Sequence, residues 1–309
     1  MGEIKITFTG DIMCKKEFVE AAYNKGIFKF DSMLIGMREF LSHSNYVIGN
    51  LETPIAGEEF GFTVEKYIFN APIEFAKSVK DAGVDFVATA NNHCLDRGIE
   101  GLIQTNKNLD LLGFEHVGTR NNPDDPANKI INIGHVKVGM LAYTYGTNAD
   151  ENKYWLKKED LYHVNMSQNQ ELHFKLWRRM YLSKYKIIRR CYRIIAILMG
   201  QKNLGCPADR KEFDFKQKKS IAKEITRLKR AGAEMFIMNW HAGGQYNMEP
   251  ASRVKKSVKY LKKLGVDTII VNHEHCVQKG DFSDAKNGNV VVYCLGNFLG
   301  GGWRILSSI

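Results

Sequence analysis

The 309-residue chain lacks any closely spaced pair of cysteines. Its six cysteines are scattered, and no two of them form a C-x-x-C unit. This distribution excludes an all-thiolate zinc site, and it favours a reducing compartment over a disulfide framework. Cys14, Cys94 and Cys276 lie near candidate metal ligands, but small buried thiols are the simpler interpretation of all three.

Long hydrophobic runs are also absent. No apolar stretch reaches the ~20 residues that a membrane-spanning helix needs. The N-terminus, MGEIKITFTGD, enters a strand-like run at once, without the basic and apolar regions of a signal peptide. Gly2 is not followed by the Ser or Thr that a myristoylation motif requires. We therefore expect a cytoplasmic protein that can lie peripheral to a membrane.

Acidic residues are missing from 172–208, although the whole chain has 34 of them beside 44 Lys and Arg, for a formal net charge of +10. Basic and apolar residues recur through this stretch at helical spacing, which predicts one basic amphipathic helix or two with a break. Gly200 and then Gly205-Cys206-Pro207 end the pattern. The basic residues are Lys175, Arg178, Arg179, Lys184, Lys186, Arg189, Arg190, Arg193 and Lys202.

Three interpretations of this stretch remain open. In the simplest, it is a helical insert that packs its apolar stripe on the core. In the second, it is a lid that brings cations to a polyanionic substrate. In the third, residues 172–199 lie on an anionic membrane surface. Nucleic acid is not favoured as a partner, because no helix-turn-helix, RNP or zinc-finger pattern accompanies the charge.

Strand and helix signals alternate through the rest of the chain. Strand-like runs cover 4–9, 46–49, 86–89, 130–133, 137–143, 235–239, 268–271 and 290–294, and helical patterns cover 30–42, 72–82, 98–112, 215–231 and 250–264. This rhythm predicts an α/β fold of βα units around a mixed sheet, with an antiparallel pair at 130–143. We expect a single domain over 1–309, with the basic helical insert at about 150–212.

Side chains that can bind a metal stand at the ends of these strand-like runs. They are Asp11 in ITFTGDIM, Glu52 in VIGNLETP, Asn92 and His93 in FVATANNHCLD, His241 in MFIMNWHAGG, and His273 and His275 in TIIVNHEHC. Open α/β sheets bind ligands at the carboxyl ends of their strands. The sequence therefore predicts that these side chains meet at one edge and support metal-assisted chemistry.

The histidines of His273-Glu274-His275 are the sharpest local signal. Side chains two residues apart in an extended segment point to the same face, so both imidazoles can reach one cluster. Two imidazoles beside an apolar strand are costly without partners, and neutral imidazole is the commonest transition-metal ligand. His241 ends a similar strand. Asp11 and Glu52 are weaker signals alone, since each also fits an ordinary turn.

Asn91-Asn92-His93 and Asp96 form a second motif. The carboxamide oxygen of Asn92 can bind a hard cation, while the next residue, His93, is directed toward the bound substrate. The same residues can instead cap the helix that follows. Asp96 either orients His93 or lies at the N-terminus of that helix. We take His93 and Asp96 as the candidate catalytic residues.

Two carboxylates, one carboxamide and three imidazoles are the ligands of a two-metal site that accepts Mn²⁺, Fe²⁺ or Zn²⁺. Two cations ~3.5–4 Å apart need a bridging ligand, and they lower the pKa of a shared water toward ~7. His93, outside the ligand shell, would donate a proton to the leaving group or hold a developing oxyanion.

Seven short segments carry a family resemblance in their order. They are GD (10–11), NLETP (50–54), YIFNAP (67–72), ATANNHCLDRGIEGL (88–102), HAGGQY (241–246), HEHCVQ (273–278) and YCLGNF (293–298). Together they resemble the CapA-type poly-γ-glutamate capsule synthesis family, which is similar to the calcineurin-like metallophosphoesterases. The match runs from residue 4 to about 299 and skips the insert. The resemblance implies a four-layer αββα sandwich.

The resemblance also implies a role for each candidate ligand. Asp11 and His275 hold the first metal, Glu52 bridges the two, and Asn92, His241 and His273 hold the second. His93 takes the catalytic position, and Asn50 and Asn297 match supporting positions near the site.

Several positions depart from the pattern. Met13 stands where the wider phosphoesterase pattern has a histidine, so we expect the first metal to be held more weakly. Ala242 and Gln245 replace a Trp and a Glu, and Glu274 stands where the final motif commonly has Pro.

Two functions of different classes follow from the resemblance. The first is a metal-dependent hydrolase or transferase of capsule or other surface-polymer synthesis, acting on a phosphoester or an amide-linked anionic polymer. The second is a non-catalytic capsule-assembly protein that keeps the metal site as a polymer-binding pocket. The intact ligand set favours the first, and Met13 favours the second. A nucleotide or nucleic-acid phosphoesterase ranks below both, because the sequence has no motif that would recognise a nucleobase.

Overall fold

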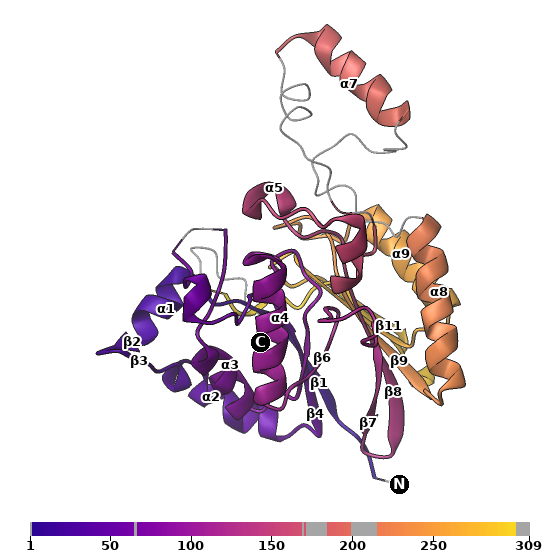
Figure 1. The fold of residues 1–309 in the computed structure, drawn as a ribbon. Coiled ribbons are helices and arrows are strands. Elements are labelled where there is room, and N and C mark those ends of the chain that lie inside the picture. Colours follow the sequence, from indigo (N-terminus) through magenta and orange to yellow (C-terminus); the bar gives the residue numbers. More distant parts are fainter. Residues whose placement is uncertain (1, 65–66, 169, 171–183, 199–214, 301–309) are drawn as a thin grey trace.

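A computed structural model describes residues 2–64, 67–168, 170, 184–198 and 215–300. Two β-sheets lie face to face between two layers of helices (Figure 1). The first sheet is parallel throughout, in the order β13 (Asn297–Leu299), β1 (Ile6–Ile12), β4 (Tyr46–Leu51), β5 (Phe86–Ala88) and β6 (Glu115–Val117). The second runs β11 (Gly280–Asp284), β12 (Asn289–Val292), β10 (Thr268–Asn272), β9 (Met235–His241), β8 (Val136–Thr144) and β7 (Lys129–Ile133).

Helices cover the outer face of each sheet (Figure 1). The first sheet is covered by α1 (Lys16–Ala22), α2 (Asp31–Ser42), α3 (Ile73–Asp81) and α4 (Gly98–Leu111), and the second by α8 (Phe215–Arg230) and α9 (Ser252–Lys263). The remaining elements are β2 (Tyr23–Asn24), β3 (Ile27–Phe28), α5 (Ala149–Asn152), α7 (Lys186–Leu198) and the 3₁₀ turns η1 (Glu58–Phe60), η2 (Lys158–His163) and η4 (Ala285–Asn287).

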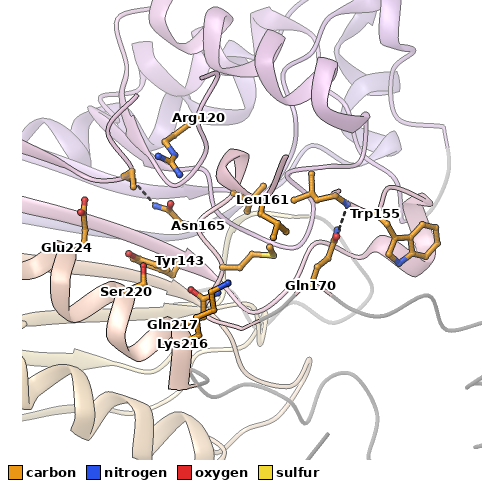
Figure 2. A pocket seen from close by; sticks show the side chains of 14 residues that line it. Arg120, Tyr143, Trp155, Leu161, Asn165, Gln170, Lys216, Gln217, Ser220 and Glu224 are labelled. Carbon is orange, nitrogen blue, oxygen red and sulfur yellow. Dashed lines mark hydrogen bonds between the residues drawn. The ribbon is translucent and has the colours of Figure 1, made fainter. Parts of the chain in front are cut away.

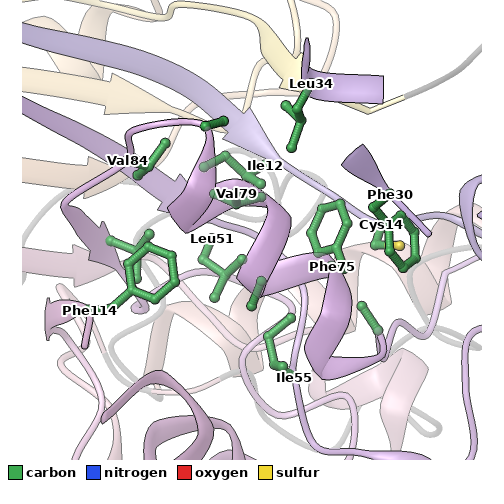
Figure 3. Close-up of a cluster of buried hydrophobic side chains, with 14 of the residues drawn as sticks. Ile12, Cys14, Phe30, Leu34, Leu51, Ile55, Phe75, Val79, Val84 and Phe114 are labelled. Carbon is green, nitrogen blue, oxygen red and sulfur yellow. The ribbon is translucent and has the colours of Figure 1, made fainter. Parts of the chain in front are cut away.

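Three apolar layers hold these elements together. The outer face of the first sheet packs against its helices, and Figure 3 shows Ile12 of β1 and Phe75 of α3 in this layer. The inner faces of the two sheets share a second layer, in which Phe86 of β5 lies with Met140 of β8. The outer face of the second sheet packs against α8 and α9. This order of layers confirms the αββα sandwich.

Side-chain alternation lets each strand serve two layers. In β4, Val47 joins the helix-facing layer and Ile48 the layer between the sheets. In β9, Phe236 and Ile237 divide in the same way. Fully burying one such side chain contributes roughly 1.5–3 kcal/mol. Strands buried on both faces read as continuous apolar runs, and this is why the sequence shows runs rather than alternation.

The predicted strands and helices are all present, with ends shifted by a few residues, and the antiparallel pairing of β7 with β8 is confirmed. The second sheet is the mixed sheet that the rhythm predicts, but the strands divide between two sheets rather than joining one. Apolar runs locate strands but do not tell which sheet each strand joins. The short strands β6, β11 and β13 have no such run and were not predicted.

β1 extends to Ile12, beyond the predicted end at residue 9, so Asp11 lies inside the strand. This end of β1 is paired on both sides, with β4 and with β13, which follows β12 of the second sheet and crosses back to β1. Asp11 and Asn297 are register partners, and the amide of Asp11 donates to the Gly296 carbonyl at 2.9 Å. A Cβ on Gly10 would collide with that same carbonyl. Glycine at position 10 therefore permits the crossing that fixes Asp11.

Part of the predicted insert is bonded to the core. Residues 164–167 bond to the end of β8 and the loop after β6, for example from the Ser167 amide to the Thr144 carbonyl at 2.7 Å. Of the predicted basic helix the structure describes α7, whereas 171–183 and 199–214 lie outside the described residues. The insert boundaries therefore stay predictions. Within the described ranges, no helix has both the length and the apolarity required to cross a bilayer.

We predict that Gly10→Ala lowers the free energy of unfolding by ~1–3 kcal/mol, because the new Cβ meets backbone that cannot move aside. Urea denaturation measures this change. Gly36 is the matched control, since it lies in α2 with open space around it. Gly36→Ala should stabilise the protein by about 0.5–1 kcal/mol. Equal unfolding free energies for the two variants would contradict the close approach at Gly10.

Candidate metal centre

Two groups of buried ligand atoms share one carboxylate. Glu52, His241 and His273 form one group, which we name the His241 triad. Asp11, Glu52 and His275 form the other, which we name the Asp11 triad. Within each triad the ligand atoms lie within 4.8 Å of one another. Glu52 belongs to both, which is the position of a bridging ligand.

The two sheets contribute to the site from opposite sides. Asp11 lies in β1 and Glu52 directly follows β4, both in the first sheet. His241 is the last residue of β9, and His273 and His275 follow β10, both in the second sheet. The cluster therefore lies between the sheets, at the carboxyl ends of their parallel strands.

The ring nitrogen Nε2 of His241 is crowded by other ligand atoms. Asn92 Oδ1 lies 2.6 Å from it, His273 Nδ1 3.1 Å and Glu52 Oε1 3.3 Å. One imidazole nitrogen carries at most one proton, so it cannot hydrogen-bond to all three. A shared divalent cation fits atoms that converge in this way. Asn92 thus adds an oxygen to the His241 triad.

Glu52 is fully buried, and neither of its carboxylate oxygens has a hydrogen-bond partner in the described part of the chain. Burial raises the pKa of Glu52 to about 8, and the negative charge of Asp11 acts in the same direction. The imidazoles of His241 and His275 lie 3.3 and 3.8 Å from Glu52 Oε1, and a buried carboxylate costs several kcal/mol unless such positive charge compensates it. The residues present therefore fit a resident divalent metal.

The other groups titrate together with Glu52. Burial favours a higher pKa for Asp11, but hydrogen bonding from His275 and the charges of His241 and His275 hold this pKa below its usual value. Burial favours a lower pKa for His275, but the charges of Glu52 and Asp11 outweigh it and raise this pKa to about 9. Without metal, protons therefore balance the charge of the cluster, and divalent cations would replace them.

Asn50 and Asn297 touch the ligands, in the supporting positions that the resemblance implied. Asn50 Nδ2 donates to Asp11 Oδ1 at 2.7 Å and lies 3.2 Å from His241 Nδ1, so it links the two triads. Asn297 Oδ1 lies 2.9 Å from His275 Nδ1. Such contacts orient ligands and fix imidazole tautomers.

His273 and His275 do not reach the cluster from an extended segment. Both have left-handed backbone, with φ of 115° and 57°. The expectation that alternation along a strand brings them together is therefore wrong, because β10 ends at Asn272 and a strained turn follows. A non-glycine residue in this region costs of order 1–3 kcal/mol, and such strain collects at functional sites.

Asp96 holds His93. Its Oδ2 lies 2.7 Å from His93 Nδ1 and accepts the amide of Phe69 at 2.7 Å, while Asn152 Nδ2 donates to Oδ1 at 3.4 Å. The Phe69 ring stacks on the imidazole, with centroids 4.2 Å apart. Arg97, not Asp96, is the N-cap of α4, so orientation of His93 is the contact that the structure shows. The catalytic role of both residues stays a prediction.

Sequence reasoning missed three neighbours of the site. The ring centroid of Tyr145 lies 4.8 Å from that of His273, and Tyr145 stacks on His241 at 6.3 Å. Tyr145 directly follows β8, so the same strand-end rule that found His241 applies to it. Phe69 lies in YIFNAP, one of the segments that carry the family resemblance. The sequence around Asn152 contains no motif that would assign it to the site.

The two triads are not equal. Met13 is buried just past β1, and its thioether is a poor ligand for hard cations. The Asp11 triad thus has three ligand groups, whereas Asn92 gives the His241 triad a fourth. The weaker binding expected at the first metal stays a prediction.

A separate cavity of about 540 Å³ lies between residues 155–170 and α8 (Figure 2). None of the predicted ligands lines it. Arg120, on one wall, donates to the backbone carbonyls of Tyr162 and Asp125 at 2.9 and 3.1 Å. Gln170 and Lys216, which flank 171–214 in the sequence, also line it. The cavity is thus lined by the first part of the predicted insert and by α8, and Arg120 holds loops together there.

Fold and site together define an αββα protein with a cluster of candidate metal ligands between its two sheets. The chain belongs to the family described as bacterial capsule synthesis protein PGA_cap, which matches residues 5–301.

Two curated relatives support this assignment. The chain is 24% identical over 304 residues to the "Capsule biosynthesis protein CapA" of Bacillus anthracis, covering 96% of this chain and 60% of the relative. It is 23% identical over 298 residues to the "PGA biosynthesis protein CapA" of Bacillus subtilis, covering 96% of this chain and 63% of the relative. The chain thus spans less than two thirds of the length of either relative.

Among solved structures, the chain is similar to a Thermus thermophilus sulfate thiohydrolase, SoxB. The TM-score is 0.40 and the identity 10%, over 85% of this chain and 36% of that one. At this TM-score the similarity says nothing about the site.

We predict that the purified protein binds about two divalent metal ions per chain and that Glu52→Gln removes both, because Glu52 serves both triads. His275→Ala should remove only the weaker ion. Metal analysis by mass spectrometry, after dialysis against Mn²⁺ or Zn²⁺, measures the ratio.

His135→Ala is the control, since His135 lies in the exposed turn between β7 and β8, away from the cluster. Melting of each variant in chelator shows whether it is folded. Retention of about two metal ions by folded Glu52→Gln would rule out the shared carboxylate.

Proposed function

We propose that the protein is a metal-dependent hydrolase of capsule or other surface-polymer synthesis, acting on a phosphoester or amide bond in an anionic polymer. The observation that carries the proposal is Glu52, buried without hydrogen-bond partners between two triads of ligands. Divalent cations held there would lower the pKa of water and polarise the oxygen of the bond to be cleaved.

We assign the proton transfer to His93. If Nδ1–H donates to Asp96, the tautomer is fixed and Nε2 is the atom left to give a proton to a leaving group. Phe69 and Asn152 hold Asp96 and the ring in place, so little reorganisation is needed. Asp96 acts through His93 and is a positioning residue.

Two further observations support an anionic polymer as substrate. The curated relatives are named for capsule and PGA biosynthesis. The chain itself has a formal net charge of +10, which attracts polyanions by long-range electrostatics. Divalent cations held by the buried imidazoles and carboxylates would attract the phosphate or carboxylate groups of an anionic polymer.

A second candidate function is a non-catalytic polymer-binding protein of capsule assembly. Met13 favours it, because this residue leaves the Asp11 triad with three ligand groups. A single well-held metal would still bind an anionic group, but it would lack the second cation that helps to clamp the attacking and leaving oxygens in a two-metal site. Turnover separates the two functions, because both need a bound metal and only the hydrolase cleaves its ligand.

We predict that His93→Gln lowers the rate of hydrolysis of a generic phosphodiester, bis-p-nitrophenyl phosphate, by about 10²–10⁴-fold, because the proton donor is lost. The metal content should stay unchanged, since His93 belongs to neither triad. Asp96→Asn should lower the rate by a smaller factor and change its pH profile.

The control is again His135→Ala, which should keep full activity. Metal-loaded protein that hydrolyses neither this diester nor poly-γ-glutamate would sink the hydrolase and leave the polymer-binding alternative. Activity equal to wild type in His93→Gln would show that another group supplies the proton.

A further inference from the structure

We propose that α7 is a membrane-surface helix that binds anionic phospholipid bilayers. The proposal concerns a surface outside the metal centre and does not depend on the reaction catalysed there. It rests on the arrangement and exposure of the side chains of α7, and on the charge of the surrounding sequence.

One side of α7 is an apolar stripe that faces solvent. Ile187, Cys191 and Ile194 are spaced i, i+4, i+7 and therefore share one face of the helix. Ile187 is 68% and Ile194 51% exposed, and Cys191 is exposed as well. Ile188 adds to the same side. Exposed isoleucines in a row on one helix mark a surface that contacts something apolar.

The adjacent side of α7 is basic. Lys186, Arg189 and Arg190 are spaced i, i+3, i+4, and all three are exposed. The sequence from 172 to 208 contains no acidic residue that can pair with them locally. A helix of this kind lies in the interface of a bilayer, with its apolar side chains among the acyl chains and its cations at the lipid phosphates.

The exposure of the stripe separates this proposal from the simpler interpretation of the segment. Tyr192, on the same apolar side, is buried, but a helical insert that packs its whole apolar side on the core would also bury Ile187 and Ile194, and the structure leaves both exposed. Figure 1 shows α7 apart from the two sheets and their helices. An anionic bilayer is favoured over a protein groove because its headgroups can neutralise several cations beside an apolar phase that takes up the isoleucines.

The position of α7 also relates the membrane to the metal centre. Figure 1 shows α7 beyond the end of the molecule that carries α5. α5 contains Asn152, which bonds Asp96 beside His93. Binding through α7 would thus turn the end of the protein that holds the metal centre toward the bilayer.

Vesicle sedimentation with the full chain tests the proposal. The probes are vesicles of phosphatidylcholine alone and with about 30% phosphatidylglycerol, at about 0.1 M and 0.5 M NaCl. We expect binding to the anionic vesicles at low salt, weaker binding at high salt and little binding to phosphatidylcholine. The double variant Ile187→Ser, Ile194→Ser should lower the bound fraction by more than about tenfold, because both side chains leave the acyl region.

Ile35→Ser is the matched control, because Ile35 of α2 is 67% exposed on another face of the protein. It should bind vesicles like wild type, and the melting temperature of all variants should be unchanged. Replacing Lys186, Arg189 and Arg190 with Gln should remove the preference for anionic lipid. Absence of sedimentation with anionic vesicles, or equal loss in Ile35→Ser, would overturn the proposal. So would a dimer in size-exclusion chromatography that the double variant dissociates, because the stripe would then be a contact between copies.

Discussion

Glu52 directly follows β4, fully buried, with two carboxylate oxygens that accept no hydrogen bond in the described part of the chain. An isolated buried carboxylate is costly by several kcal/mol, so its surroundings must supply positive charge. The surroundings here are His241, His273 and His275 from the second sheet, and a second carboxylate, Asp11, from the first. With imidazoles alone, several ligand atoms lie at hydrogen-bonding distance with too few protons to bond them all. Divalent cations would bind all of these atoms.

The fold brings these groups together from two sheets. Two sheets, packed through their inner faces, bring the carboxyl ends of β1, β4, β9 and β10 to one place. The return of the chain from β12 to β13 ties the second sheet to β1 beside Asp11. The left-handed backbone at His273 and His275 is held by contacts to the first sheet, from the His273 amide to Asp11 Oδ2 at 3.2 Å and from the His275 ring to Asn297 at 2.9 Å. Metal bound between the sheets would couple both halves of the protein, so cation binding and folding are linked.

The sequence predicts the parts of this structure that depend on local pattern. Continuous apolar runs locate the main strands, and polar residues at their ends identify all six candidate ligands, as well as His93 with its partner Asp96. Pattern does not show that the strands form two sheets, because a strand buried on both faces looks the same in either. β13 is too short to give a run, so local pattern does not show that a strand from far along the chain pairs with β1 beside Asp11. The turn at His273 and His275 has no glycine to signal it. Strand alternation therefore predicts that both imidazoles reach the cluster, but it does not predict the turn that brings them there.

Paramagnetic resonance of the protein loaded with Mn²⁺ tests the bridging role of Glu52 most directly. At about one equivalent of Mn²⁺, the His241 triad fills first and gives the signal of an isolated ion. At about two equivalents, the account predicts an exchange-coupled spectrum, because a shared carboxylate holds two ions ~3.5–4 Å apart. Only isolated Mn²⁺ at full loading, or no bound Mn²⁺ at all, would contradict a dinuclear centre built on Glu52.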